Sequence, residues 1–122
     1  MCYNQSRDVM SKIKINVYKD FNNIKENEEF FAIMQDNVIK YIDFADNKMI
    51  IDINNNYILR ENGDFAYNID FNKNIINIVA KKLKKEFNKN IKTILLKKTN
   101  NAFLVKYHLI DEDVINEFYI KY

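Results

Sequence analysis

The chain has 122 residues, a formal net charge of +2 at pH 7, and 48% hydrophobic and 14% aromatic residues. This composition is too hydrophobic for a disordered protein, and the length suits one domain around a single modest core. The only cysteine, Cys2, excludes a disulfide framework and is typical of a reducing compartment, so we expect a cytoplasmic protein.

Residues 1–10 are expected to form a disordered or frayed terminus ahead of a single domain over residues 11–122. They lack the apolar core of a signal peptide. Apolar runs such as residues 94–96 are far shorter than the roughly 18 residues that a membrane-spanning helix needs. The sequence therefore predicts neither a secretion signal nor membrane association.

Asn, Ile and Lys dominate the composition, whereas the chain has one Gly and no Pro or Trp. Codons for Asn, Ile and Lys are rich in A and T, so an A/T-rich bacterial genome explains the bias without selection for function. The density of lysine is therefore weak evidence for any binding activity.

From residue 11 onwards, runs rich in β-branched and aromatic residues alternate with Asn or Asp turns, a rhythm that predicts an all-β sandwich or barrel. Asn takes the turn positions because, after glycine, it adopts a positive φ at low cost. Asn62-Gly63 suits a type I′ hairpin, in which both central residues have positive φ. Turns are predicted at residues 22–23, 36–37, 46–47, 54–56, 62–63, 72–74, 88–90, 100–101 and 111–113.

Four segments alternate between apolar and polar residues, which is the period of a strand. They cover residues 13–17, 64–71, 103–109 and 117–121. Such segments are half-buried strands with one wet face, as antiparallel sheets allow.

The segment over residues 75–87 fits two structures. A strand would place Ile76, Ile78 and Ala80 on one face. An amphipathic helix would begin at an Asn cap, and local signals favour it. The helix rests on apolar residues spaced by three and four, namely Ile75, Ile76, Val79, Leu83 and Phe87.

Three stretches are similar to a known family: SKIKINVY at residues 11–18, ILRENGDFAYNIDF at 58–71 and FLVKYHLIDEDVINEFY at 103–119. Together they resemble the YwiB-like family, small bacterial proteins of unknown function with a calycin-type (lipocalin-like) barrel. The best matches are Arg60 with Gly63 before an aromatic strand, and the Tyr-x-Leu pattern that ends at Leu109.

The resemblance implies an antiparallel up-and-down β-barrel of about 8–10 strands and favours a strand over residues 75–85. The chain departs from the family in the longer Arg-to-Gly spacing and in lacking a Thr-Pro-aromatic-Gly turn near residues 72–76. A barrel of this size holds either a filled core or a cavity for one small ligand.

Arg60 stands out in a chain that uses Lys almost everywhere. Its planar guanidinium suits bidentate binding of a carboxylate or phosphate, and the alternative is a salt bridge to Asp52 or Asp70. Tyr67 and Tyr107 fall on the apolar faces of their strands. With Arg60 they are the candidate ligand contacts, unless they are ordinary core tyrosines.

Residues 81–98 form a second asymmetry, with eight lysines against Glu86 alone, a net charge of +7. Such a surface attracts polyanions, but it has no Arg, and only Phe87 is available to stack on bases, so nucleic acid is not favoured. Codon bias and a solvated face are the favoured explanation. The candidate polyanion contacts are Lys81, Lys82, Lys84 and Lys85.

No catalytic, metal or cofactor motif is present. His108 lies on the lysine side of its strand and is interpreted as a surface residue. Cys2 has no activating base nearby. The run at 111–113 lacks the Gly and Glu spacing of a calcium loop. With one glycine, no Gly-rich phosphate or nucleophile motif exists.

The sequence thus predicts a non-enzymatic β-barrel, with no cofactor, that binds a small amphipathic or anionic molecule in its interior. The alternative is a protein- or RNA-interaction module that uses the basic surface of residues 81–98. The oligomeric state is left open.

Overall fold

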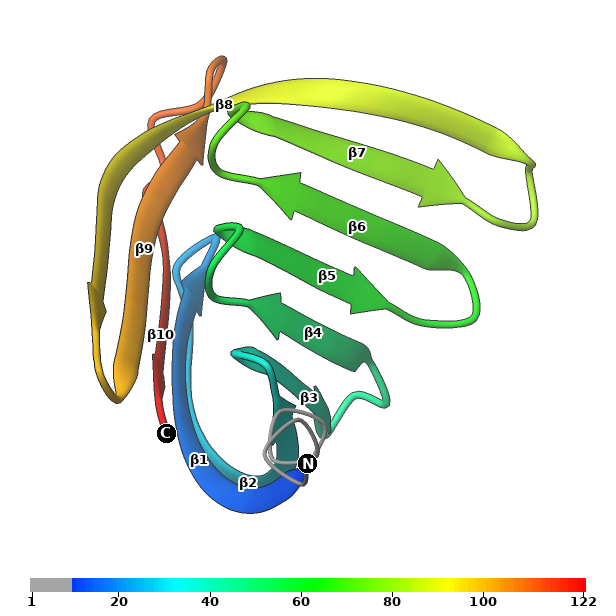
Figure 1. The fold of residues 1–122 in the computed structure, drawn as a ribbon. Helices are drawn as coiled ribbons and strands as arrows, with labels where there is room; N and C mark the ends of the chain where they lie inside the picture. Colours follow the sequence, from blue (N-terminus) through cyan, green and yellow to red (C-terminus); the bar gives the residue numbers. More distant parts are fainter. Residues whose placement is uncertain (1–9) are drawn as a thin grey trace, which may run out of the picture.

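The structure, a computed structural model, describes residues 10–122, so the prediction of a frayed terminus falls almost wholly outside the described residues, as does Cys2. Ten strands and no helix make up the described part (Figure 1). Their bounds are β1 (Ser11–Phe21), β2 (Ile24–Gln35), β3 (Val38–Ile42), β4 (Lys48–Asp52), β5 (Tyr57–Glu61), β6 (Phe65–Asp70), β7 (Ile75–Ala80), β8 (Lys85–Thr99), β9 (Ala102–Leu109) and β10 (Asn116–Lys121).

Every strand pairs antiparallel with its neighbours in sequence, and β1 pairs with β10 to close the barrel. The prediction of an all-β, antiparallel up-and-down barrel is confirmed, and its ten strands lie within the expected range. Closure leaves few strand edges exposed to pair with other chains.

The barrel has two halves joined by one long strand. The first part of β8 pairs with β7 as far as Asn90, and the second part pairs with β9 from Ile91, with a bulge between Thr93 and Leu95. Bulges bend a strand and increase its twist. In Figure 1, β5 to β7 run roughly from left to right, and β9 and β10 run roughly from top to bottom. Strand β8 bends from the first direction into the second and so joins the two halves.

The helix considered for residues 75–87 is wrong, and the strand interpretation is confirmed. Strand β7 pairs with β6 and β8, and Ile76, Ile78 and Ala80 point inward and are buried. Leu83, which completed the helical pattern, lies in the following turn and is exposed. Pairing on both edges, together with the β-branched residues, overrides the local spacing.

Asn residues do form two hairpins of the expected kind. Asn22 and Asn23 have φ of 53° and 65°, and Asp36 and Asn37 have φ of 52° and 62°. Both pairs connect strands through two residues with positive φ, as a type I′ turn requires.

Of two further turn predictions, the position of the turn at residues 62–63 is confirmed but its type I′ conformation is not, and the turn at residues 88–90 is wrong. The turn after β5 has no positive φ at Asn62 or Gly63; the Asn62 side chain instead accepts hydrogen bonds from the backbone N–H groups of Asp64 and Phe65. The turn predicted at residues 88–90 lies inside β8, and the real turn ends at Lys84, with a φ of 50°. Asn is so common in this chain that it also fills strand positions.

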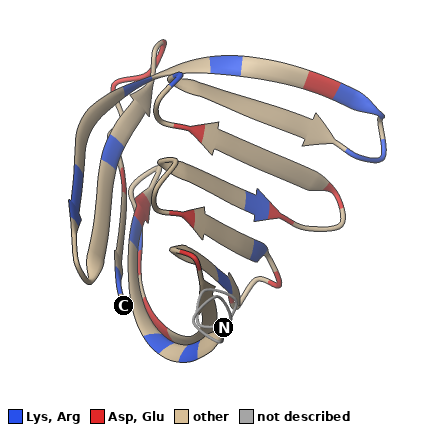
Figure 2. Ribbon diagram, in the orientation of Figure 1, with Lys and Arg blue, Asp and Glu red and all other residues tan. Residues whose placement is uncertain are grey.

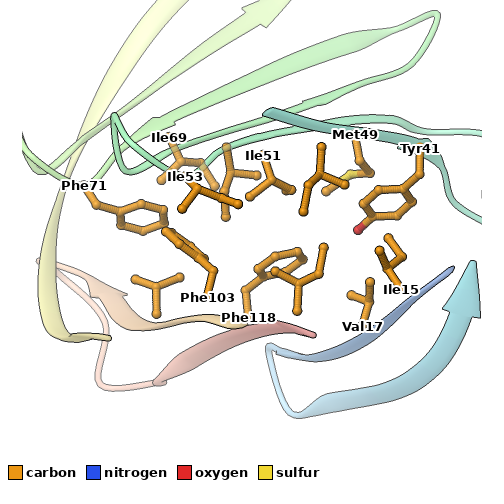
Figure 3. Packing of buried hydrophobic residues seen from close by; sticks show 14 of the residues in the cluster. Ile15, Val17, Tyr41, Met49, Ile51, Ile53, Ile69, Phe71, Phe103 and Phe118 are labelled. Carbon is orange, nitrogen blue, oxygen red and sulfur yellow. The ribbon is translucent and has the colours of Figure 1, made fainter. Parts of the chain in front are cut away.

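The middle of the barrel is filled by side chains from both halves (Figure 3). Ile51 and Ile69 face Phe103 and Phe118 across the interior, and Phe118 has no exposed surface. The residues that are no more than 1% exposed are Ile15, Val17, Ile39, Met49, Ile51, Phe103, Val105, Phe118 and Ile120. Any ligand site inside the barrel must therefore lie towards one of its ends.

We predict that Phe118→Ala lowers the free energy of unfolding by about 3–5 kcal/mol, because it removes a fully buried ring and leaves a cavity. The matched control is Phe31→Ala, since Phe31 is 82% exposed and its truncation should change the free energy by less than about 0.5 kcal/mol. Urea denaturation followed by tyrosine fluorescence measures both. Equal losses would contradict the description of the core.

Candidate functional site

A pocket of about 230 Å³ opens at the end of the barrel where β5 to β7 lie against the ends of β9 and β10. Its base is apolar and its rim carries polar groups. The lining residues are Phe21, Asn22, Met49, Ile58, Arg60, Tyr67, Ile69, Ile76, Ile78, Lys89, Tyr107, Leu109 and Asn116. The three candidate ligand contacts, Arg60, Tyr67 and Tyr107, all line this mouth pocket.

Strand register explains how these side chains meet. Arg60 pairs with Met49 on one side and Tyr67 on the other, and Tyr67 pairs with Ile78. Directly paired residues point to the same face of a sheet, so the four form one row across the inner face. The Arg60 guanidinium lies 5.6 Å from the centre of the Tyr67 ring, a cation–π contact.

Arg60 carries a charge without a matching carboxylate. The salt bridge considered between Arg60 and Asp52 or Asp70 is wrong. Both aspartates pair with Tyr57, which lies three residues before Arg60 on β5. Tyr57 and the two aspartates therefore lie on the outer face of the sheet, whereas Arg60 lies on the inner face. Within residues 10–122 Arg60 forms no ion pair, and its Nε is buried with no hydrogen-bond partner. A buried donor left unsatisfied costs about 1–3 kcal/mol.

Tyr107 forms the opposite wall and is 5% exposed. Burial raises the pKa of Tyr107 to about 12, although the nearby charge of Arg60 acts in the opposite direction. Its ring makes edge contacts with Phe21 and Phe71, at centroid distances of 6.5 Å and 5.4 Å. The hydroxyl therefore keeps its proton at neutral pH and offers the pocket both a donor and an acceptor.

The cation next to Arg60, Lys19, differs from it because carboxylates neutralise its charge. Arg60 also borders a polar cleft beside Lys19. The Lys19 ammonium lies 3.4 Å from Glu26 and 3.8 Å from Asp43, so its charge is shared between two carboxylates. The two cations that line the mouth pocket, Arg60 and Lys89, form no ion pair with a described residue. The pocket therefore attracts anions.

Asp43 holds the loop between β3 and β4 against this cleft. Its carboxylate accepts hydrogen bonds from the backbone N–H groups of Ala45 and Asn47 and from the Asn47 side chain. Burial alone would raise the pKa of Asp43, but the Asn47 bonds, the Lys19 charge and the Ala45 bond together lower it below its ordinary value. The folded loop thus favours the ionised form of Asp43.

Lys89 is a pocket residue that the sequence analysis missed. It pairs with Ile76 and so faces inward from β8. The alternation of Phe87, Lys89 and Ile91 indicates this face, but the turn predicted at residues 88–90 concealed it. Asn116 was missed as well; it is buried, and its side-chain oxygen accepts a hydrogen bond from the backbone N–H of Asn22, which joins β10 to the first hairpin.

The lysines of residues 81–98 are spread over the β7–β8 turn and along β8 (Figure 2). Lys81 is ion-paired with Glu61 at 2.9 Å and Lys82 with Asp64 at 3.1 Å. Of the four candidate polyanion contacts, only Lys84 and Lys85 lack an ion pair to a described residue. The lysines further along β8 point to both of its faces, so this geometry gives the polyanion alternative little support.

His108 lies apart from the mouth pocket. It is half-buried, pairs with Lys92 in the register, and its Nδ1 lies 2.7 Å from the Leu109 carbonyl oxygen. Over residues 10–122 no cluster of His, Cys, Asp and Glu could hold a metal ion. None of the described residues belongs to a helix long and apolar enough to cross a membrane.

Comparison with known proteins found no family model, no curated protein and no solved structure that matches this chain. The resemblance to the YwiB-like family, with its calycin-type barrel, stays a prediction. The argument for function therefore rests on the geometry of the mouth pocket.

We predict that Arg60→Met leaves the free energy of unfolding unchanged or raises it by up to about 2 kcal/mol, because a flexible apolar side chain replaces a cation with an unsatisfied buried donor. Lys19→Met is the matched control; it should lower the free energy by about 1–3 kcal/mol, since it leaves the buried Asp43 carboxylate without its cation. Thermal and urea unfolding measure both. A loss above about 1 kcal/mol for Arg60→Met would show that the guanidinium is satisfied in the fold.

Asp43 should make stability depend on pH. Because its pKa is lower in the folded state than in the unfolded chain, the carboxylate stabilises the fold at neutral pH, and this stabilisation is lost as the pH falls below about 5. Asp43→Asn should therefore be less stable than the parent at pH 7, and the difference should shrink towards pH 3. Asp46→Asn, in the same loop but exposed, is the control and should follow the parent at every pH. A constant difference between Asp43→Asn and the parent would contradict the assignment.

Proposed function

We propose that the protein is a non-enzymatic binding protein that takes a small amphipathic anion into the mouth pocket of its barrel. The observation that carries this proposal is Arg60, a cation with a buried, unpartnered Nε at the rim of an apolar pocket. A carboxylate or similar acceptor at this point would satisfy the guanidinium in the planar geometry that Arg prefers.

The walls of the pocket suit the apolar part of such a ligand. Its base is formed by aliphatic side chains that are at most 8% exposed, namely Met49, Ile58, Ile69, Ile76 and Ile78. The volume of about 230 Å³ equals that of about eight water molecules in the liquid, at about 30 Å³ each. A ligand with about ten non-hydrogen atoms fills it, with part of its charged group in the opening.

The polar groups of the pocket favour binding over chemistry. They are the side chains of Asn22, Arg60, Tyr67, Lys89, Tyr107 and Asn116, and among residues 10–122 no carboxylate, imidazole or thiol lines the pocket. General acid–base catalysis at neutral pH relies mostly on such groups. Asparagines, tyrosines and two cations are suited instead to orienting an anionic ligand.

We predict that octanoate, with ten non-hydrogen atoms and one negative charge, binds the protein in isothermal titration calorimetry. 1-Octanol should bind about tenfold more weakly, because it lacks the charge-assisted bond to Arg60. Octylammonium should show no saturable binding, since its cation would lie beside Arg60 and Lys89.

Arg60→Met should weaken octanoate binding about tenfold and leave 1-octanol binding unchanged. The control is Lys84→Met, which removes an exposed cation away from the pocket and should alter neither affinity. The proposal fails if octanoate does not bind at millimolar concentration, or if Arg60→Met and Lys84→Met have the same effect.

A further inference from the structure

Strands β2 and β3 separate soon after the turn that joins them. Their pairing ends at Ile33 and Lys40, although β2 extends back to Ile24 and stays paired with β1 throughout. Beyond that point, Tyr41 and Ile42 pair only with β4. Alternate residues on the two facing edges therefore present backbone N–H and C=O groups that no described strand takes up. Such edges can pair with another chain.

An outer groove of about 600 Å³ lies where the strands part. Its walls include Phe31 on β2 and Ile42 on β3, and Ile33 closes its end. Phe31 is 82% exposed, Ile42 is 57% exposed and Ile33 is 40% exposed. Three large apolar side chains on one concave surface exceed the scattered single residues that are normal on a protein surface.

The charged side chains that line this groove, in the part of the chain that the structure describes, are all lysines. Lys12, Lys40 and Lys48 line it from β1, β3 and β4. None of the three forms an ion pair or side-chain hydrogen bond within the described chain. Lys48 pairs with Glu61 in the register, but the Glu61 carboxylate binds Lys81 instead. The rim therefore has three lysines outside any ion pair to a described residue, although, after the hydrogen bond and charge of Lys81, the charge of Lys48 also helps to lower the pKa of Glu61.

We propose that this groove is a docking site for an extended segment of a partner protein in which acidic and apolar side chains alternate. The segment adds along the free edge of β2, where its backbone pairs with the unpaired groups. Its apolar side chains point inward onto the floor formed by Ala32 and Tyr41, and its carboxylates point outward, on the face that carries Phe31, Ile42 and the lysine rim. An alternating pattern is required because successive side chains of a strand point to opposite sides.

Charge and shape favour this partner over two other possible occupants of the groove, a second copy of this chain and an anionic membrane. A second copy of this chain joined through a two-fold axis would bring the lysine rim of one protomer against that of the other, which is repulsive. An anionic membrane would match the charge, but it would leave the backbone edges and the concave floor, formed by Ala32 and Tyr41, without contacts.

The test uses a fluorescein-labelled heptapeptide of alternating glutamate and valine, with fluorescence anisotropy as the measurement. Two further peptides are compared, one with lysine in place of glutamate and one with alternate amides N-methylated, which removes edge hydrogen bonds. We expect saturable binding of the glutamate peptide, and binding of the other two weaker by about tenfold or more. Equal binding of the three peptides, or no binding of the glutamate peptide at millimolar concentration, overturns the proposal.

Two protein variants test whether the peptide binds in this groove. Phe31→Glu should weaken binding about tenfold, because it removes an apolar wall and adds a like charge. Leu83→Glu, the same kind of change at a residue that is 69% exposed in the β7–β8 turn, should leave binding unchanged. Octanoate binding should be the same in both variants, so this proposal and the proposed function are tested separately.

Two outcomes would assign the groove to another occupant and overturn the proposal. One is a dimer in sedimentation equilibrium that Phe31→Glu converts to a monomer. The other is binding to vesicles of anionic phospholipid that Phe31→Glu abolishes and that the glutamate peptide does not displace.

Discussion

The pairing of β1 with β10 is the contact on which the rest of the structure depends. Asn16 to Asp20 lie opposite Lys121 to Glu117, which joins the first and last strands of the chain. This pairing brings Val17 and Ile120 to the same inner face, where both are no more than 1% exposed. Without it the chain would be an open, twisted sheet with two free edges and one uncovered apolar face, and no interior would exist.

Closure of so long a meander also creates the features that the proposed functions use. Strand β8 belongs to both halves of the barrel, and the bend at its bulge turns β9 and β10 away from the far ends of β5 to β7. The inner face there is only partly covered, which leaves the mouth pocket. On the other side, β2 follows β1 while β3 follows β4, and the groove opens where they part. Both sites lie where neighbouring strands diverge.

Arg60 shows how such a place differs from the rest of the core. The inward row that contains Arg60 begins and ends with the buried apolar residues Met49 and Ile78, and an apolar residue at position 60 would extend that apolar surface. The chain instead places a cation there with a buried donor that lacks a partner. Groups that cost stability in this way are expected at functional or strained sites, and this expectation supports the proposed binding role of Arg60.

Much of the strand pattern was readable from the residues. The alternation over residues 13–17 and 103–109 places the inward side chains correctly, because the period of two follows from strand geometry alone. The assignment of Tyr107 to the inner face was right for the same reason. Turn positions were less reliable: Asn residues mark the hairpin at 22–23, but at 88–90 they lie within a strand. A residue used so often in turns and strands alike carries little information about either.

The sequence by itself determined which side chains share a face and that the chain forms an antiparallel β structure, since both depend on local geometry and on the exclusion of apolar groups from water. Only the tertiary structure decided that residues 75–80 are a strand, because their spacing suits a helix until β6 and β8 take up their backbone groups. It also decided that Arg60 faces the pocket and not Asp52 or Asp70. A shift of one residue in register moves every side chain of a strand to the other face, and register is set by the neighbouring strands.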